Sequence, residues 1–132
     1  MKPLVLALGL AAMPVSAHEG HSPFDDPGSL WQLIEIDGKP FKAKALLEFP
    51  EIGRMAGRAP CNRFSASLWS AYPWFQPGPI AATRSACPDL AEESRFLEAL
   101  GRMTLAEADG DILILTGDSR DSMVFTRLVS GE

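Results

Sequence analysis

The sequence predicts a mainly β fold, in which a small antiparallel β-barrel or strongly curved sheet has one α-helix closing one side. Short β-rich runs recur along the chain and are separated by turn signals such as Asp37-Gly38 and Asp109-Gly110. A helical pattern stands out once, over residues 89–101. A lone helix among antiparallel strands with short turns is typical of this architecture.

The first residues have the pattern of a secretory signal peptide, which we place at residues 1–17. Lys2 precedes an apolar run from Leu4 to Met13, and Val15-Ser16-Ala17 has the small-residue spacing that signal peptidase accepts. The apolar run is about half the length that spans a bilayer, so it predicts cleavage rather than a membrane anchor. We therefore expect a periplasmic or secreted protein.

The mature chain is expected to hold one folded domain. Residues 18–28 are polar and contain two prolines and two glycines, which predicts a flexible leader. The domain then covers residues 29–132. The whole chain has a formal net charge of −5 and no run of Lys or Arg, which excludes nucleic acid and anionic lipid as principal partners. We expect a monomer without a membrane span.

The first half of the domain is predicted to consist of strands. SLWQLIEI, residues 29–36, is β-rich and stops at the Asp37-Gly38 turn. In AKALLEF, residues 43–49, one face carries Ala45, Leu47 and Phe49 and the other is mostly polar, the pattern of a half-buried strand. Strand-like sequence continues to Trp69, and the prolines of residues 70–79 then predict a loop.

The helix and a closing meander follow the loop. Asp89 can cap the helix, and Glu92 has the capping-box spacing from it, while Gly101 is placed to end the helix. Three strands then follow, in MTLAEA, DILIL and SMVFTRL. The run ILIL, residues 112–115, does not alternate, so we expect its strand to be covered on both faces.

The two cysteines, Cys61 and Cys87, are separated by 87 − 61 = 26 positions. In an oxidising compartment a disulfide between them is favoured, and on the chain-entropy model it contributes about 3.5 kcal/mol. Two free thiols, or a catalytic or metal-binding cysteine, are the alternatives. The histidines, His18 and His21, both lie in the leader, so the rest of the chain has no imidazole to activate a cysteine or serine.

The histidines themselves are weak metal-ligand candidates. After cleavage behind Ala17, the new amino terminus and His18 could chelate copper or zinc, with His21 as a third ligand. A solvated leader without metal is the simpler interpretation, and we expect no cofactor. Acidic pairs such as Glu92-Glu93 lie where solvated carboxylates are ordinary, so no catalytic residue is predicted.

Four segments together resemble the META domain family, which includes the heat-shock HslJ-like proteins. They are SLWQLIEIDGKP, GRAPCNRFSA, IAATRSACPDLAEESRFLEAL and DGDILILTGDSRDSMVFTRL, and the resemblance covers about Ser29 to Leu128. The positions that match the family pattern are Trp31, Gly38, Cys61, Asn62, Thr83, Cys87, and Glu92 or Glu93. Pro60 departs from that pattern, because the family commonly has Gly before the Cys-Asn pair.

The resemblance implies a lipocalin-like barrel or half-barrel with one helix, a paired Cys61 and Cys87, and an envelope or secreted location. It also implies a loose association with stress, antibiotic tolerance or motility, and no enzymatic activity. Two non-enzymatic functions fit. In one, the loop aromatics line the mouth of a hollow barrel and hold a small apolar ligand; they are Trp69, Tyr72, Trp74 and Phe75. In the other, the domain is an interaction or inhibitor module that docks on another exported protein. Packing of these aromatics in the core is the alternative to ligand binding.

Overall fold

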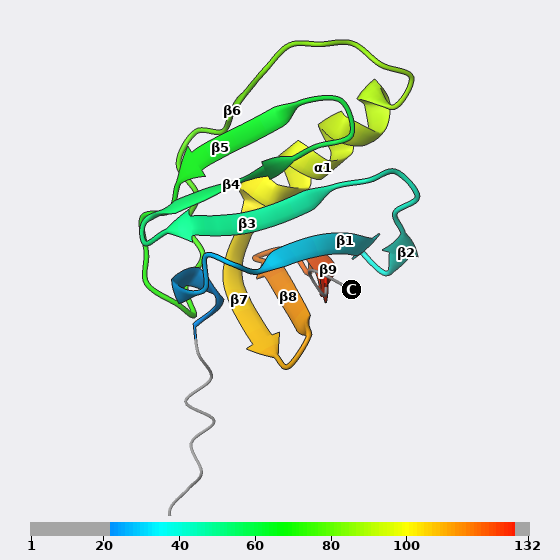
Figure 1. Ribbon diagram of the computed structural model, residues 1–132. Helices are drawn as coiled ribbons and strands as arrows, with labels where there is room; N and C mark the ends of the chain where they lie inside the picture. Colours follow the sequence, from blue (N-terminus) through cyan, green and yellow to red (C-terminus); the bar gives the residue numbers. More distant parts are fainter. Residues whose placement is uncertain (1–21, 129–132) are drawn as a thin grey trace, which may run out of the picture.

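The computed structural model of the protein describes residues 22–128, which fold into one antiparallel sheet with a single packed α-helix (Figure 1). The predicted signal peptide, His18 and His21 lie outside the described residues. The elements are η1 (Pro23–Asp25), β1 (Leu30–Ile36), β2 (Lys39–Pro40), β3 (Leu46–Glu51), β4 (Arg54–Arg58), β5 (Arg63–Ser67), β6 (Ala81–Ala82), α1 (Leu90–Arg102), β7 (Met103–Asp109), β8 (Ile112–Gly117) and β9 (Ser122–Leu128).

The predicted fold class is confirmed, and the sheet is open rather than a closed barrel. Its strands lie in the order β6-β5-β4-β3-β1-β9-β8-β7, and β2 pairs with β1 outside this path. The β3–β6 half and the β7–β9 half cross at a steep angle in Figure 1, with α1 behind the first half. Phe96 of α1 contacts Phe64 of β5 edge to face and also lies near Phe41, so the helix covers the inner face of that half.

Local sequence signals determine the strands and their turns. Asp37 and Gly38 both have positive φ in the turn between β1 and β2, as the Asp-Gly pair predicts. In β3, Leu47 and Phe49 are fully buried, and the alternation predicted for this strand is confirmed. The expectation for ILIL is wrong: Leu113 and Leu115 are fully buried, but Ile112 and Ile114 are half-buried, because the core lies on one side of the sheet.

Large side chains fill the interior between the sheet and the helix. The largest fully buried side chains come from both halves of the sheet, the loop and the helix; they include Trp31, Phe49, Phe75, Phe96 and Phe125. This close-packed core holds the helix and the proline-rich loop in fixed positions against the sheet. Among residues 22–128, no helix is both long and apolar enough to cross a membrane.

The predicted flexible leader needs a correction at its end. Residues 18–28 were expected to be mobile, but Pro23–Asp25 form the 3-10 helix η1, and Phe24 is 5% exposed. Its ring packs 4.9 Å from the ring of Phe49 and meets Tyr72 edge to face at 5.5 Å. The physical reason is that one aromatic side chain can bury enough apolar area to order a short polar segment. Within the described residues, folded structure therefore begins at Ser22.

Candidate functional site

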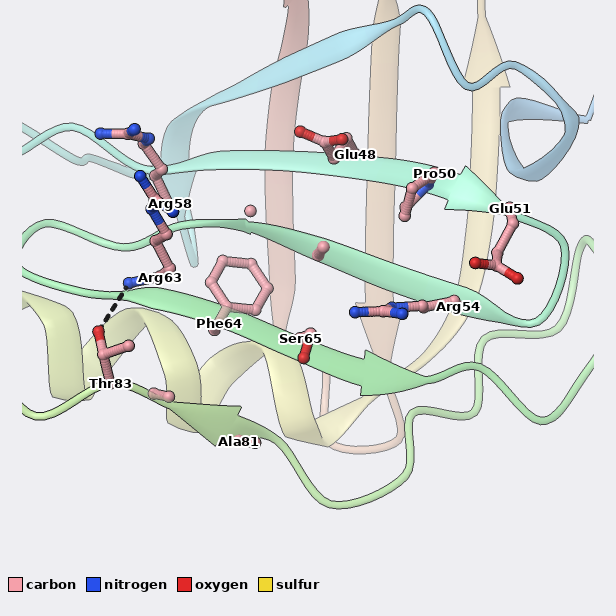
Figure 2. A pocket seen from close by; sticks show the side chains of 13 residues that line it. Glu48, Pro50, Glu51, Arg54, Arg58, Arg63, Phe64, Ser65, Ala81 and Thr83 are labelled. Carbon is pink, nitrogen blue, oxygen red and sulfur yellow. Dashed lines mark hydrogen bonds between the residues drawn. The ribbon is translucent and has the colours of Figure 1, made fainter.

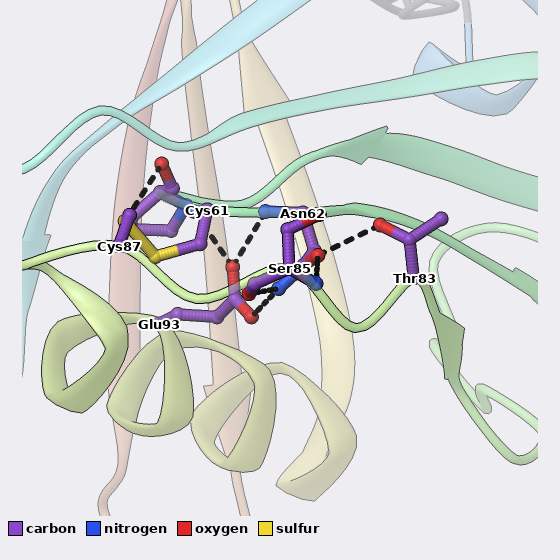
Figure 3. Close-up of a disulfide and its surroundings, with 7 residues drawn as sticks. Cys61, Asn62, Thr83, Ser85, Cys87 and Glu93 are labelled. Atoms are coloured by element: carbon purple, nitrogen blue, oxygen red, sulfur yellow. Dashed lines mark hydrogen bonds between the residues drawn. A yellow bond between two sulfur atoms is a disulfide. The ribbon is translucent and has the colours of Figure 1, made fainter.

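The disulfide links the end of β4 to the start of α1. Cys61 follows β4 and Cys87 precedes the helix, and the two cysteines are bonded to each other (Figure 3). Among the alternatives for these cysteines, the structure has the disulfide rather than free thiols. The bond closes a loop of 26 positions that contains β5, the proline-rich loop and β6. It therefore holds the helix against one end of the β3–β6 half.

A buried carboxylate reinforces this connection. Glu93 of α1 is 5% exposed, and one of its oxygens accepts hydrogen bonds of 2.8 Å from the backbone N–H groups of both Cys61 and Asn62. Its other oxygen accepts a 2.6 Å hydrogen bond from Asn62 Nδ2 (Figure 3). Three N–H donors thus offset the free-energy cost of burying this carboxylate, a role that a cation often has elsewhere.

The Asn62 side chain uses its remaining hydrogen-bonding capacity on the segment before the helix. Its Nδ2 group donates to the Ser85 carbonyl, and its Oδ1 atom accepts from the Ser85 N–H and the Thr83 hydroxyl. Thr83 Oγ1 in turn accepts from the backbone N–H of Arg63. One asparagine therefore connects the helix, the segment that contains Thr83 and Ser85, and the first residue of β5. We call Asn62, Thr83, Ser85 and Glu93 the asparagine network.

The two neighbouring glutamates of the helix have different surroundings. Glu92 is only partly buried and forms an ion pair with Arg95, whereas Glu93 belongs to the asparagine network. Asp89 occupies the N-cap position, but its side chain makes no capping hydrogen bond. The capping box predicted for Asp89 and Glu92 is therefore wrong, because Glu92 faces solvent and pairs along the helix.

The proline-rich loop carries the second notable feature, two exposed tryptophans. Trp69 is 63% exposed and Trp74 is 62% exposed, although tryptophan side chains are usually largely buried. We call residues 69–78 the tryptophan loop. Phe75 of the same loop is 1% exposed in the core, and Tyr72 packs against the core with its hydroxyl accepting from the Ala108 N–H. The loop aromatics thus divide into an inner pair and an outer pair.

The backbone of the tryptophan loop is held on both sides. The Trp69 N–H donates to the Gln76 carbonyl, and the Gly78 N–H donates to the Ser67 carbonyl. On the other side, the Phe75 N–H donates to the Thr104 carbonyl of β7, and the Ala106 N–H donates to the Pro73 carbonyl. These four hydrogen bonds fix the loop between β5 and β7.

Packing also fixes the outer tryptophans in place. A Cβ atom on Gly78 would lie 2.8 Å from the Trp69 ring, so this glycine lets the indole lie against the backbone. Trp74 pairs with Leu105 of β7, whose side chain is also exposed. Beside them is a hollow of about 340 Å³. It is lined by Tyr72, Pro73, Leu105, Ala106, Glu107, Ile114 and Thr116.

The four aromatics proposed as a ligand site do not line one cavity. Phe75 is buried in the core, Tyr72 lines the hollow beside β7, and Trp69 and Trp74 are on the surface. The alternative prediction, that all four aromatics pack in the core, is also wrong for the two tryptophans. They are exposed because the loop lies at the rim of the open sheet. No group of three or more His, Cys, Asp or Glu side chains within residues 22–128 is arranged to hold a metal ion.

One electrostatic cluster stabilises the start of the domain. Arg127 of β9 lies 4.5 Å over the Trp31 ring and forms ion pairs with Asp26 and Asp111. The Ser29 hydroxyl donates to Asp26, and this hydrogen bond, together with Arg127, holds the pKa of Asp26 below its ordinary value. Arg127 also donates to Ser29. The family-pattern residue Trp31 is thus a core side chain under a surface cation.

Comparison with models of known protein families shows to which family this chain is related. The family model described as META domain matches residues 26–130. The chain belongs to the META domain family. In this META domain, the family-pattern residues Cys61, Asn62, Thr83 and Cys87 meet at the disulfide and the asparagine network. Gly38 and Trp31 are far from them in the chain and serve the β1 turn and the core.

Solved structures share the fold of this META domain. A protein from Burkholderia xenovorans, determined by NMR, is 22% identical with a TM-score of 0.62, and the match covers 89% of this chain and 97% of that one. A second NMR structure is 21% identical with a TM-score of 0.57, covering 74% and 87%. A crystal structure of a duf4847 family protein from Bacteroides vulgatus is 11% identical with a TM-score of 0.61, covering 74% and 90%. No curated protein matches the sequence.

Proposed function

We propose that this META domain is an exported, non-enzymatic interaction module that docks on another protein of the cell envelope through its tryptophan loop. A role in envelope stress or homeostasis accords with what the family resemblance implies. The observation that carries the proposal is the exposure of Trp69 and Trp74, 63% and 62%, on a loop that is otherwise anchored in the core.

Two exposed tryptophans on a fixed loop favour protein recognition. Tryptophan is enriched among the residues that dominate binding energy, because its large apolar surface is buried when a partner excludes water. The hydrogen bonds of the loop and the burial of Phe75 hold the backbone before any partner arrives. A preorganised loop loses less conformational entropy on binding. The hollow beside Leu105 offers a place for one side chain of the partner.

The apolar-ligand hypothesis has less support. A small apolar ligand needs an enclosed apolar site, and the interior of this domain is filled by side chains such as Trp31, Phe49 and Phe125. The outer tryptophans are in solvent rather than at the mouth of a cavity. The interaction module is therefore the function that the geometry supports best.

Two observations support export. The N-terminal sequence has the pattern of a signal peptide, and the folded domain has a disulfide, a bond that persists in oxidising compartments. The mature protein in this proposal acts in the periplasm or outside the cell. Denatured mass measurement of the protein recovered from the envelope fraction tests cleavage after Ala17. A full-length mass in that fraction would contradict it.

A comparative pull-down tests the docking function. The bait is the mature protein, with a Trp69→Ala/Trp74→Ala double variant and an Ile34→Ala/Leu90→Ala control that removes two other exposed apolar side chains. We expect the parent and the control to enrich the same envelope protein and the tryptophan variant to lose it. Direct titration of that protein should show at least about tenfold weaker binding for the tryptophan variant. Equal binding by all three baits would refute the proposal.

A further inference from the structure

The outer face of the β3–β6 half has a groove that no predicted site includes. Its volume is about 770 Å³, and Figure 2 shows it from close by. The floor is made of small residues: Ala56, Gly57, Ser65, Ala81 and Ala82. The Phe64 ring lies on the inner side of these strands against Phe96, and a Cβ atom on Gly57 would approach it to 2.8 Å, so Gly57 has no room for a side chain. The floor is therefore low and mostly apolar, with the Ser65 hydroxyl between Ala56 and Ala81.

Two arginines stand side by side at one end of this groove. Arg58 of β4 and Arg63 of β5 are direct partners in the antiparallel register, and both are exposed. Figure 2 shows both at the end of the groove that also holds Thr83. A second hollow of about 380 Å³ shares these three residues, so the arginine pair lies between two hollows.

The arginine pair has no acidic partner. Within residues 22–128, neither Arg58 nor Arg63 forms an ion pair, whereas Arg95 and Arg102 each form one and Arg127 forms two. Like charges opposite each other on neighbouring strands are destabilising. Arg54, Arg84 and Arg120 also form no ion pair within residues 22–128, so Arg58 and Arg63 differ from them in lying opposite each other on neighbouring strands. Two adjacent guanidinium groups provide the forked donors that match a carboxylate or phosphate.

The asparagine network positions the pair. Cys61 and Asn62 directly precede Arg63, and their N–H groups are bound by Glu93. The N–H of Arg63 itself donates to Thr83 Oγ1 (Figure 2). The backbone at the arginine end of the groove is therefore fixed to the helix before any anion binds, which lowers the entropy cost of binding.

The far end of the groove limits the size and charge of the ligand. Arg54 is four residues from Arg58 along β4, about 13 Å away in a strand, and it pairs in register with Glu51. Glu48 also lines the groove. These two carboxylates would repel an extended polyanion. The complementary ligand carries its negative charge at one end and an apolar part behind it.

We propose that this groove binds a small organic anion, with a phosphate or carboxylate group held by Arg58 and Arg63 and a flat apolar part lying over Ala56 and Ala81. The ligand class follows from the charge at one end of the groove and the apolar floor. The site is separate from the tryptophan loop and does not depend on the proposed docking function.

NMR titration with phenyl phosphate, benzoate and inorganic phosphate tests this site. Shifts of the amide signals of Ala56, Ser65 and Ala81, with weaker binding at higher salt, are expected for at least one of the two aromatic anions. Inorganic phosphate should bind more weakly than phenyl phosphate, because it leaves the apolar floor empty. A response to phenyl phosphate alone assigns a phosphate ligand, and a response to benzoate alone assigns a carboxylate. No saturable shift with either anion would overturn the proposal.

Matched variants separate this site from nonspecific charge effects. Arg58→Gln/Arg63→Gln should weaken binding at least about tenfold, whereas Arg95→Gln/Arg120→Gln, which removes the same charge elsewhere, should change it by less than about twofold. The Trp69→Ala/Trp74→Ala variant should bind the anion as the parent does, so failure of one proposal leaves the other testable. Equal affinity of the two arginine double variants would overturn the site. The dispersion of the amide spectrum verifies that each variant is folded.

Discussion

Asn62 and Glu93 are 31 residues apart in the chain and are joined by two hydrogen bonds, from the Asn62 N–H at 2.8 Å and from its Nδ2 group at 2.6 Å. Both side chains are buried. The carboxylate also accepts the Cys61 N–H, so the covalent link and the polar link lie side by side. This pair fixes the corner at which the helix meets the sheet.

Replacement of Glu93 by Ala should lower the free energy of unfolding by about 3 kcal/mol or more, because two buried donors and one partly buried donor lose their acceptor. Glu92→Ala is the matched control. It removes an exposed ion pair with Arg95 and should change stability by less than about 0.5 kcal/mol. Urea unfolding of both variants, with the disulfide intact, measures the difference. Equal losses would show that the network does not stabilise the corner.

Replacement of the two aromatic neighbours Trp74 and Phe75 should lower stability by very different amounts. Phe75→Ala leaves a cavity in the core and should cost about 3–5 kcal/mol. Trp74→Ala removes an exposed side chain and should cost less than about 1 kcal/mol. Far-UV circular dichroism during urea unfolding measures both without relying on tryptophan fluorescence. A large loss for Trp74→Ala would mean that this side chain is needed for folding rather than free for a partner.

The stability contributed by Asp26 should depend on pH. Its folded pKa lies below the ordinary value of 3.8, through the Ser29 hydrogen bond first and Arg127 next. A carboxyl group with a lowered folded pKa stabilises the folded state above its unfolded pKa, and this contribution disappears as pH falls through the folded pKa. The parent should therefore be more stable than Asp26→Asn at pH 7, and the difference should shrink below about pH 4.

Urea midpoints at neutral pH and at about pH 3 measure this dependence. Asp25→Asn is the control, because Asp25 is exposed and takes part in none of the ion pairs of residues 22–128. The control should follow the parent at both pH values. A constant difference between the parent and Asp26→Asn across this range would exclude the titration of Asp26 as its source.

Arg58→Gln should leave stability unchanged or raise it by up to about 0.5 kcal/mol, because it relieves the repulsion with Arg63 across the strand pair. Arg95→Gln should have the opposite sign, since it breaks an ion pair within one turn of the helix. Thermal unfolding at low and high salt measures both, and added salt should reduce each effect. A loss of more than about 1 kcal/mol for Arg58→Gln would reveal a structural role for this guanidinium.

Local patterns predict much of the fold, and long-range pairing decides the rest. The Asp37-Gly38 turn and the alternation around Leu47 depend on neighbouring residues, so the sequence reveals them directly. Whether the sheet closes depends on whether its two edge strands, β6 and β7, pair with each other; α1 separates them in the chain, and no local pattern relates them. The sequence therefore leaves the barrel and the open sheet as alternatives.

In the candidate sites too, some features follow from neighbouring residues and others depend on long-range packing. Glu92 and Glu93 are adjacent and chemically identical, and only the packing angle of the helix decides which one reaches Asn62. Trp74 pairs with the distant strand β7, and residue type alone suggests burial of both Trp69 and Trp74. The arginine pair could have been found, since Arg58 and Arg63 flank the short turn of one hairpin and are therefore opposite each other.

The hydrogen bonds between the tryptophan loop and β7 limit how another copy of the protein could pair with this strand. β7 is the last strand of the sheet, and the unpaired groups of an edge strand can template another chain. Pro73 and Phe75 already occupy the outward backbone groups of Thr104 and Ala106, and β6 at the other edge is only two residues long. The loop therefore covers backbone groups of β7 through which another copy could otherwise add a strand.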